Sequence, residues 1–142
     1  MSYDLNFEPT GVQRARRHRL DTEVWAALVA EAERVLGPVE TFAGEDFYEL
    51  TDESTGIQLS YYVGEAAISV PYWYSGAAAE AIVAKIYELG RSAERLTGFT
   101  GHDPQLDLPL TKAATKVRKS VASFDQVAAM FAREQAERER RG

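Results

Sequence analysis

The clearest pattern in the sequence is the alternation of apolar and polar residues between positions 57 and 73. Apolar or aromatic side chains occupy every second position, and the positions between them carry mostly small or polar residues. Such alternation is typical of antiparallel strands with one buried face. We expect a hairpin with a two-residue turn at Gly64-Glu65, which pairs Tyr61 with Ile68, Leu59 with Val70 and Ile57 with Tyr72.

Further strands are expected before and after this hairpin. Residues 2–8 alternate in the same way and place Tyr3, Leu5 and Phe7 on one buried face. Residues 39–42 and 46–51 predict two more strands, so that residues 39 to 72 form a four-strand meander with one apolar face. In that meander Leu50 lies opposite Ile57. Residues 99–105 are compatible with a short strand followed by a turn. The position of the first strand in the sheet is left open.

Three segments show the spacing of amphipathic helices. The first begins after Asp21, whose side chain suits the N-cap position, and ends at Gly37-Pro38. The second covers residues 76–97, with Ser75 as its expected N-cap. The last runs from about 124 to 139 behind a capping box formed by Ser123 and Gln126. Residues 111–122 are basic and compatible with a helix.

These elements predict an α+β fold. We expect a single antiparallel sheet of about five strands, made of the N-terminal strand and the four-strand meander. Two long helices pack on one face of this sheet, and a C-terminal helix follows. The 142 residues are expected to form one domain, in which residues 111–142 are a helical C-terminal extension.

Composition narrows the chemistry and the compartment. The chain contains no cysteine, which excludes disulfides, thiol catalysis and cysteine-ligated metals. It has no apolar run near 18 residues, so we expect no membrane span. The first residues lack the basic and apolar regions of a signal peptide, and we therefore expect a cytoplasmic protein.

The net charge of −6 is unevenly distributed along the chain. Eleven acidic residues but only one basic residue lie between Asp21 and Glu65, whereas eight of the sixteen basic residues fall between 14 and 19 or between 112 and 119. This segregation favours an acidic surface that binds another protein, such as a basic one. The candidate partner-binding residues are Glu45, Asp46, Glu49, Asp52 and Glu53. The alternative is a solvated acidic face that basic loops offset.

The basic run from Arg14 to Arg19 raises the question of nucleic-acid binding. Arginines at this density are able to grip phosphate groups. The acidic total and the lack of a recognisable nucleic-acid-binding module argue against such a partner. Whether this run has a function is left open.

A second candidate site combines aromatic and polar residues near the start of the second long helix. Its members, expected to line a small-molecule pocket, are Tyr72, Trp73, His102, Asp103 and Gln105. The alternative is structural: Asp103 caps a turn at Pro104, and Gln105 bonds a neighbouring loop. Similarly, Tyr62 and Trp73 are exposed if the second face of the sheet is open, and buried if the C-terminal helix covers it.

No metal, cofactor or catalytic motif is expected. His102, Asp103 and Asp107 match no strong metal signature in type and spacing. The sequence has no phosphate-binding glycine loop, no Gly-x-Ser-x-Gly elbow and no His-Glu-x-x-His motif.

Short motifs carry a family resemblance. The opening Met1-Ser2-Tyr3-Asp4-Leu5 resembles that of a set of small, mostly uncharacterised bacterial proteins found often in actinobacteria. The later order resembles them too: a strand, Pro71-Tyr72-Trp73, a long helix, Thr97-Gly98 and Asp103-Pro104-Gln105. In that family a tyrosine usually precedes Asp-Pro-Gln, where this chain has His102. Some similar proteins look like immunity proteins of polymorphic toxin systems. The resemblance covers roughly residues 1–107 and implies no catalytic residues.

Three functional hypotheses follow from these observations. The first is a non-enzymatic protein-binding module, such as an immunity-type inhibitor, that uses an acidic surface. The second is a small-molecule-binding protein or an enzyme with a pocket near Trp73 and His102. The third is a structural or oligomerising module. The sequence favours the first, names no partner, and leaves the oligomeric state undetermined.

Overall fold

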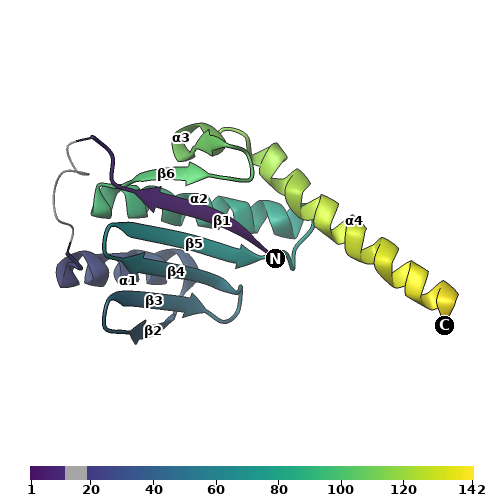
Figure 1. The fold of residues 1–142 in the computed structure, drawn as a ribbon, viewed down its shortest axis with the longest axis horizontal. Helices are drawn as coiled ribbons and strands as arrows, with labels where there is room; N and C mark the ends of the chain where they lie inside the picture. Colours follow the sequence, from purple (N-terminus) through teal and green to yellow (C-terminus); the bar gives the residue numbers. More distant parts are fainter. Residues whose placement is uncertain (12–18) are drawn as a thin grey trace.

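The computed structural model describes residues 1–11 and 19–142. In this part of the chain, seven strands form one open antiparallel sheet with the order β2-β3-β4-β5-β1-β6-β7 (Figure 1). The elements are β1 (Ser2–Glu8), α1 (Thr22–Leu36), β2 (Glu40–Ala43), β3 (Phe47–Asp52), β4 (Ile57–Tyr62), β5 (Glu65–Pro71), α2 (Gly76–Thr97), β6 (Thr100–Asp103), β7 (Leu108–Pro109), α3 (Leu110–Ala113) and α4 (Val117–Arg141).

The sequence correctly predicts the α+β class and the single antiparallel sheet, but its element count is wrong. The described residues form seven strands and four helices instead of about five strands, two long helices and a C-terminal helix. The short strand that residues 99–105 predict forms as β6, which has four residues and joins the sheet beside β1. Strand β7 has only two residues, too few to show an alternation in the sequence. The additional helix is α3, a single turn that starts directly after Pro109.

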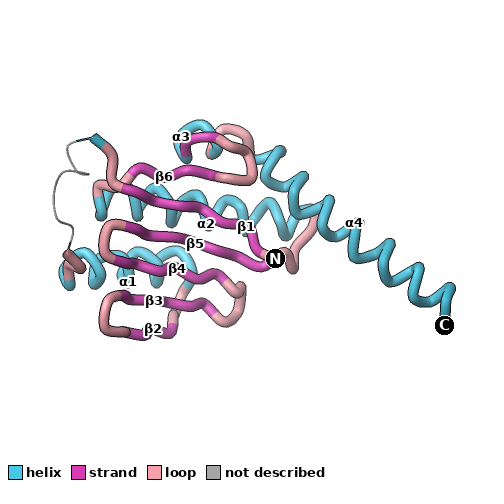
Figure 2. The backbone as a smooth tube through the Cα atoms, in the orientation of Figure 1, coloured by secondary structure: helices cyan, strands magenta, loops and turns pink. Residues whose placement is uncertain are grey.

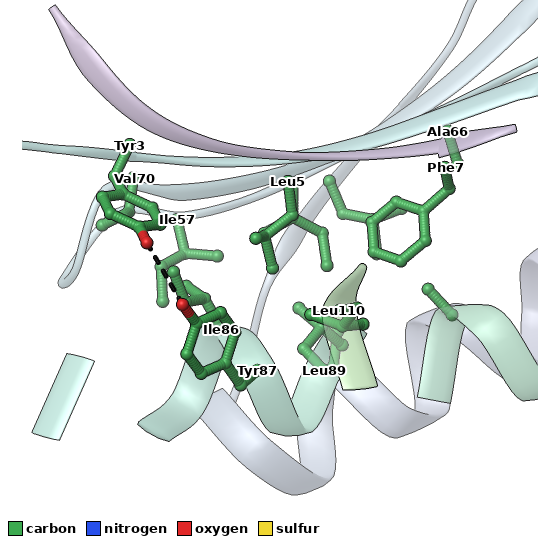
Figure 3. Close-up of a cluster of buried hydrophobic side chains, with 14 of the residues drawn as sticks. Tyr3, Leu5, Phe7, Ile57, Ala66, Val70, Ile86, Tyr87, Leu89 and Leu110 are labelled. Atoms are coloured by element: carbon green, nitrogen blue, oxygen red, sulfur yellow. Dashed lines mark hydrogen bonds between the residues drawn. The ribbon is translucent and has the colours of Figure 1, made fainter. Parts of the chain in front are cut away.

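Strand β1 lies inside the sheet, between β5 and β6. Its inward side chains Tyr3, Leu5 and Phe7 are fully buried, which confirms the alternation seen in the sequence. Figure 3 shows these three side chains directed at α2, where Tyr87 and Leu89 meet them. The first strand of the chain is therefore a central part of the core.

The β4–β5 hairpin forms, but its turn is one residue earlier than predicted. The observed register pairs Tyr62 with Glu65 and Leu59 with Ile68, so the two turn residues are Val63 and Gly64. Gly64 has a φ of 72°, and this register gives it the second turn position, where a positive φ is needed. Because the turn lies one residue earlier, each residue of β4 pairs with a residue of β5 two positions before the predicted one. A shift of two positions keeps the same side chains on the buried face.

The β3–β4 register differs from the prediction in the same way. Leu50 pairs with Leu59, whereas Ile57 faces Asp52. The connecting turn consists of residues 53–56 and ends at Gly56, which has a φ of 80°. Asp52 is consequently part of strand β3 and not of the loop.

Helices α1 and α2 lie side by side on one face of the sheet (Figure 2). As predicted, Asp21 caps α1: its carboxylate accepts hydrogen bonds from the backbone N–H groups of Glu23 and Val24, at 2.9 and 3.1 Å. The bounds of α2 also agree with the prediction, but Ser75 makes no side-chain cap. Instead, the N–H of Gly76 donates to Asp125 of α4 at 2.9 Å.

Helix α4 begins earlier than the sequence predicts. It runs without a break from Val117, so Ser123 lies inside it and donates to the carbonyl of Lys119 instead of capping a new helix. Phe124 is fully buried between Tyr3 and Tyr72, with ring centroids at 5.3 and 4.9 Å. Beyond this anchor the helix extends away from the body of the protein (Figure 1).

The core is tightly packed where β6, α2 and α3 meet. A Cβ atom on Gly101 would lie 2.9 Å from Cε1 of Phe7 and 3.0 Å from Cδ2 of Leu110. A Cβ atom on Gly90 would lie 3.0 Å from the same Leu110 atom. The two glycines thus leave the space that Leu110 fills, and this packing holds α3 against the sheet.

We predict that Gly101→Ala lowers the free energy of unfolding by about 1–3 kcal/mol, because it overpacks a full site. Leu110→Ala alone should cost about 2–5 kcal/mol through the cavity it creates. The double variant should lose less than the sum, since the new methyl group occupies part of that cavity. Urea denaturation measures all three, with Leu28→Ala on α1 as an additive control. Additivity of Gly101→Ala with Leu110→Ala would contradict this account.

Candidate functional site

The face of the sheet opposite α1 and α2 is not covered by any described helix (Figures 1 and 2). We call it the open face; it consists of the strand positions that alternate with the buried ones. Tyr62 is 39% exposed on this face, and Trp73, just beyond β5, is 69% exposed. The alternative in which the C-terminal helix buries these two residues is therefore wrong, since α4 extends away from the sheet.

The sheet carries negative charge and no compensating Lys or Arg. All Lys and Arg residues that the structure describes lie in helices and loops, and none lies in a strand. Seven acidic residues occupy strand positions, and the pairing places five of them on the open face and two on the buried face. The five are Asp4, Glu8, Glu40, Glu49 and Glu65, and the two are Asp52 and Asp103.

Aromatic side chains form a cluster at the β2 end of the open face. Phe47 lies between Phe42 and Tyr62, with ring centroids at 5.8 and 5.5 Å. Phe42 is 61% exposed although it is large and apolar. Exposed aromatic residues of this kind, bordered by charged residues, are frequent in protein interfaces.

The predicted partner-binding residues do not form a single patch. Glu45 and Asp46 are exposed in the β2–β3 turn, and Glu49 lies on the open face of β3. Glu53 is exposed in the β3–β4 turn, at the far end of the same strand. Four of the five residues thus remain available to a partner, but they are spread along the whole length of β3 and its two turns.

Asp52, the fifth residue, is only 4% exposed, so the prediction that it belongs to an acidic surface is wrong. Its side chain accepts hydrogen bonds from the hydroxyl of Thr55 at 2.7 Å and from the N–H of Ser54 at 3.2 Å. It therefore holds the β3–β4 turn, because carboxylates in turns commonly bond the backbone two residues on.

The residues of the predicted small-molecule pocket are divided between the two sides of the sheet. His102 pairs with Asn6 on the open face and contacts the exposed Asp107 at 3.2 Å. Asp103 is fully buried on the other side. Tyr72 packs on the core against Tyr3 and Phe124, whereas Trp73 is exposed. The geometry does not bring these side chains together around one cavity.

Asp103 is the centre of a buried polar network. Its Oδ2 accepts hydrogen bonds from the hydroxyls of Tyr3 at 2.5 Å and Tyr87 at 2.7 Å. Its Oδ1 accepts from the N–H and the side-chain amide of Gln105, at 2.9 and 2.8 Å, and from the N–H of Leu106 at 3.2 Å. Five donors therefore replace the water that the carboxylate loses on burial.

The direction of the hydrogen bonds in this network is determined by the number of protons. Each tyrosine has one hydroxyl proton, and both protons are used on Asp103. Ser120 of α4, which also bonds the Tyr87 hydroxyl, must then be the donor. The network thus joins α4, α2, β1 and the end of β6. It leaves Asp103 saturated with donors, so this carboxylate is not free to act as a base.

Gln105 extends the β1–β6 pairing beyond the last residue of β6. Its side-chain carbonyl accepts from the N–H of Asp4 at 2.8 Å, and its amide donates to the carbonyl of Asp4 at 2.7 Å. The side chain therefore bonds β1 as the backbone of a neighbouring strand would. The structural alternative for Asp-Pro-Gln is confirmed in its main point, except that Gln105 bonds a strand and not a loop.

Sequence reasoning missed three members of this network: Tyr3 as a polar group, Tyr87 and Ser120. Tyr87 did carry a signal, because it lies four residues after Val83 and three before Gly90 on the buried side of α2. Ser120 gave none, since its place on α4 depends on where that helix begins.

Burial makes the tyrosines of the core weaker acids than a tyrosine in water, because it raises their pKa values. It raises the pKa of Tyr87 to about 12, and the hydrogen bond to Asp103 acts in the same direction. The pKa of Tyr3 is raised further, again mainly by burial and then by its bond to Asp103. Tyr61, Tyr72 and Tyr74 also have pKa values raised by burial.

Some sequence predictions lie outside the described residues. Most of the basic run from Arg14 to Arg19 falls at positions 12–18, outside the described residues. Within residues 1–11 and 19–142, no group of three or more His, Asp or Glu side chains is arranged to hold a metal ion. In the same ranges no helix has the length and apolar character required to cross a membrane.

No protein-family model matches the chain, and no curated protein matches it significantly. The family resemblance noted in the sequence therefore remains a prediction that rests on the motif residues themselves. The structure explains what two of these residues do: Asp103 and Gln105 connect the end of β6 to β1.

We predict that Asp103→Asn lowers the free energy of unfolding by at least about 3 kcal/mol. An asparagine has one acceptor oxygen instead of two, and its NH₂ group would face groups that themselves donate. Asp107→Asn, at an exposed position nearby, should change stability by less than about 0.5 kcal/mol. Denaturant titrations of both variants test this, and equal stability of the two would show that the network contributes little.

Stability should also fall at alkaline pH. An unfolded tyrosine loses its proton near pH 10, whereas the buried phenols keep theirs to higher pH. The contribution of these phenols to the free energy of unfolding is complete below about pH 10. It is lost as the pH rises toward about 12, the pKa of Tyr87. Urea midpoints measured between pH 8 and 11.5 should show this decline, and Tyr87→Phe should make it shallower. An unchanged slope in that variant would contradict the assignment.

Proposed function

We propose that this protein is a non-enzymatic binding module that docks a basic protein on its open face. The observation that carries the proposal is the charge of the sheet: its strands place five carboxylates on that face and contain no Lys or Arg. A surface of one sign attracts a partner of the opposite sign, raises the association rate and disfavours wrong partners.

The size and composition of the open face support this role. Seven strands at about 4.8 Å spacing, the longer ones about 20 Å in length, give a surface roughly 29 by 20 Å. This is comparable to the roughly 800 Å² that each protein contributes to a standard interface. Phe42, Tyr62 and Trp73 provide exposed aromatic groups, the residue types that contribute most often to binding energy.

The distribution of polar groups favours binding over catalysis. Tyr72 and Asp103 lie on the opposite side of the sheet from His102, and Asp103 is already bonded to five donors. An enzyme pocket at this place would need those side chains to converge on one substrate. The similarity of the Ser-Tyr-Asp-Leu and Asp-Pro-Gln motifs to immunity-type proteins is consistent with an inhibitor of a basic toxin.

We predict that replacing three open-face carboxylates strongly weakens binding of the basic partner. The partner is first captured from lysate with the native protein and purified, and its dissociation constant is then measured directly. The triple variant Glu40→Lys, Glu49→Lys and Glu65→Lys should raise that constant at least 100-fold. Binding by the native protein should also weaken as salt increases, because ions screen exposed charges.

The matched control carries the same change in net charge on other surfaces. Glu33→Lys, Glu80→Lys and Glu134→Lys change exposed residues of α1, α2 and α4. This variant should bind within about threefold of the native protein if the open face is the docking surface. Equal weakening by both sets would show that only the total charge matters, and no weakening by the open-face set would refute the proposal.

A further inference from the structure

Strand β2 is one edge of the sheet, and half of its backbone hydrogen-bonding groups face outward. The N–H of Gly44 donates to the carbonyl of Phe47 at 2.9 Å, so residue 44 directs its peptide groups at β3. Because this direction alternates along an antiparallel strand, Glu40 and Phe42 also bond β3. Thr41 and Ala43 therefore present their N–H and C=O groups to the free edge.

The two edges of the sheet differ in their capacity to accept another strand. The far edge is β7, which has only two residues, one of them Pro109, and it passes directly into α3. Proline has no N–H to donate, and short or proline-containing edges resist strand pairing. All four residues of β2 are exposed, and none of them is proline.

The side chains around the β2 edge select the charge of an added strand. Glu40 and Phe42 of β2 lie on the open face, Glu49 lies beside Phe42 on β3, and Glu45 and Asp46 are in the adjoining turn. Neither β2 nor β3 contains Lys or Arg. An added strand would place every second side chain on the open face beside Glu40 and Phe42, with Glu49 one strand farther, and a cation is favoured there.

The same charges argue against a second copy of this chain as the added strand. Pairing β2 with β2 of another copy would bring two sets of carboxylates together along one edge. Like charges on adjacent strands are destabilising, and each chain already carries a net charge of −6. The acidic residues thus protect the edge from self-association while leaving it open to a basic segment.

We propose that the partner adds an extended segment to β2 as an eighth strand, paired with Thr41 and Ala43 and carrying Lys or Arg at alternate positions. This inference rests on the proposed function and specifies how the basic protein docks. The added backbone bonds would supply affinity. The alternating cations on the open face, next to Glu40 and one strand away from Glu49, would supply selectivity.

The probe is a synthetic acetylated and amidated peptide with the sequence Lys-Val-Lys-Val-Lys-Val-Lys. We expect it to bind the native protein, and amide hydrogen exchange followed by NMR should show protection of Thr41 and Ala43. The N–H of Phe42, already bonded to β3, should be little affected. A peptide of the same charge, Lys-Pro-Lys-Pro-Lys-Pro-Lys, lacks the N–H groups of a strand at its prolines and should bind at least tenfold more weakly.

The matched variant is Ala43→Pro, which removes one outward N–H but no bond to β3 and leaves every carboxylate in place. It should weaken binding of the Lys-Val peptide at least tenfold. Thr41→Pro is a second variant with the same logic. Far-UV circular dichroism and thermal melts check that both variants fold.

The outcomes separate this inference from the proposed function. If the purified partner responds to the open-face charge variant but not to Ala43→Pro, the open face docks the partner and strand addition is wrong. Equal affinity for the two peptides, or no binding of the Lys-Val peptide at millimolar concentration, also overturns strand addition. A dimer of the native protein that Ala43→Pro dissociates would assign the edge to a second copy and refute the inference.

Discussion

The hydrogen bonds around the buried carboxylate of Asp103 hold together parts of the chain that are far apart in sequence. A carboxylate without water is costly unless donors surround it, and the donors come from β1, from α2 and from the turn after β6. Through Tyr87, the same network reaches Ser120 of α4. The position of four elements thus depends on satisfying one acidic group, and hydrophobic packing alone would not fix their mutual orientation so closely.

This arrangement also explains how the protein keeps its two faces distinct. The polar groups needed for structure, Asp52 and Asp103, are buried on the helix side and bonded to donors of the protein itself. The carboxylates of the open face have no cationic side chain beside them in the sheet, because no Lys or Arg lies in a strand. Their negative potential therefore extends into solvent.

Local patterns predicted the elements well, because alternation and helical spacing depend on neighbouring residues. The buried residues of β1, the cap at Asp21 and the bounds of α2 all follow from the sequence. Features that depend on distant residues did not follow from it. The N-terminus of α2 is capped by Asp125, and the place of β1 is determined by pairing with residues about 60 and 95 positions later. The predicted registers of the two hairpins differ from the observed ones because the position of one glycine in each turn, Gly56 or Gly64, determines the register.

The candidate site shows the same division. The acidic excess and the exposed aromatic residues were visible in composition, yet alternation alone did not show which carboxylates face solvent. Asp52 resembles its neighbour Glu53 in the sequence, and only the four-residue turn places it in the core. The pocket expected from Tyr72, Trp73, His102, Asp103 and Gln105 is divided by the sheet, because adjacent residues in strands and their extensions point to opposite faces.

The central position of β1 has a consequence for how the chain folds. Strand β1 is synthesised before both of its neighbours, β5 and β6, and its Tyr3 hydroxyl bonds Asp103, which lies 100 residues later. Contacts of such separation carry a large loop-closure entropy and slow the search for the native state. During synthesis, at 5–20 residues per second as a rough rate, β1 therefore spends at least several seconds with an unpaired apolar face. The meander of β2 to β5, whose contacts are local, can form early and offer β5 as the first template for it.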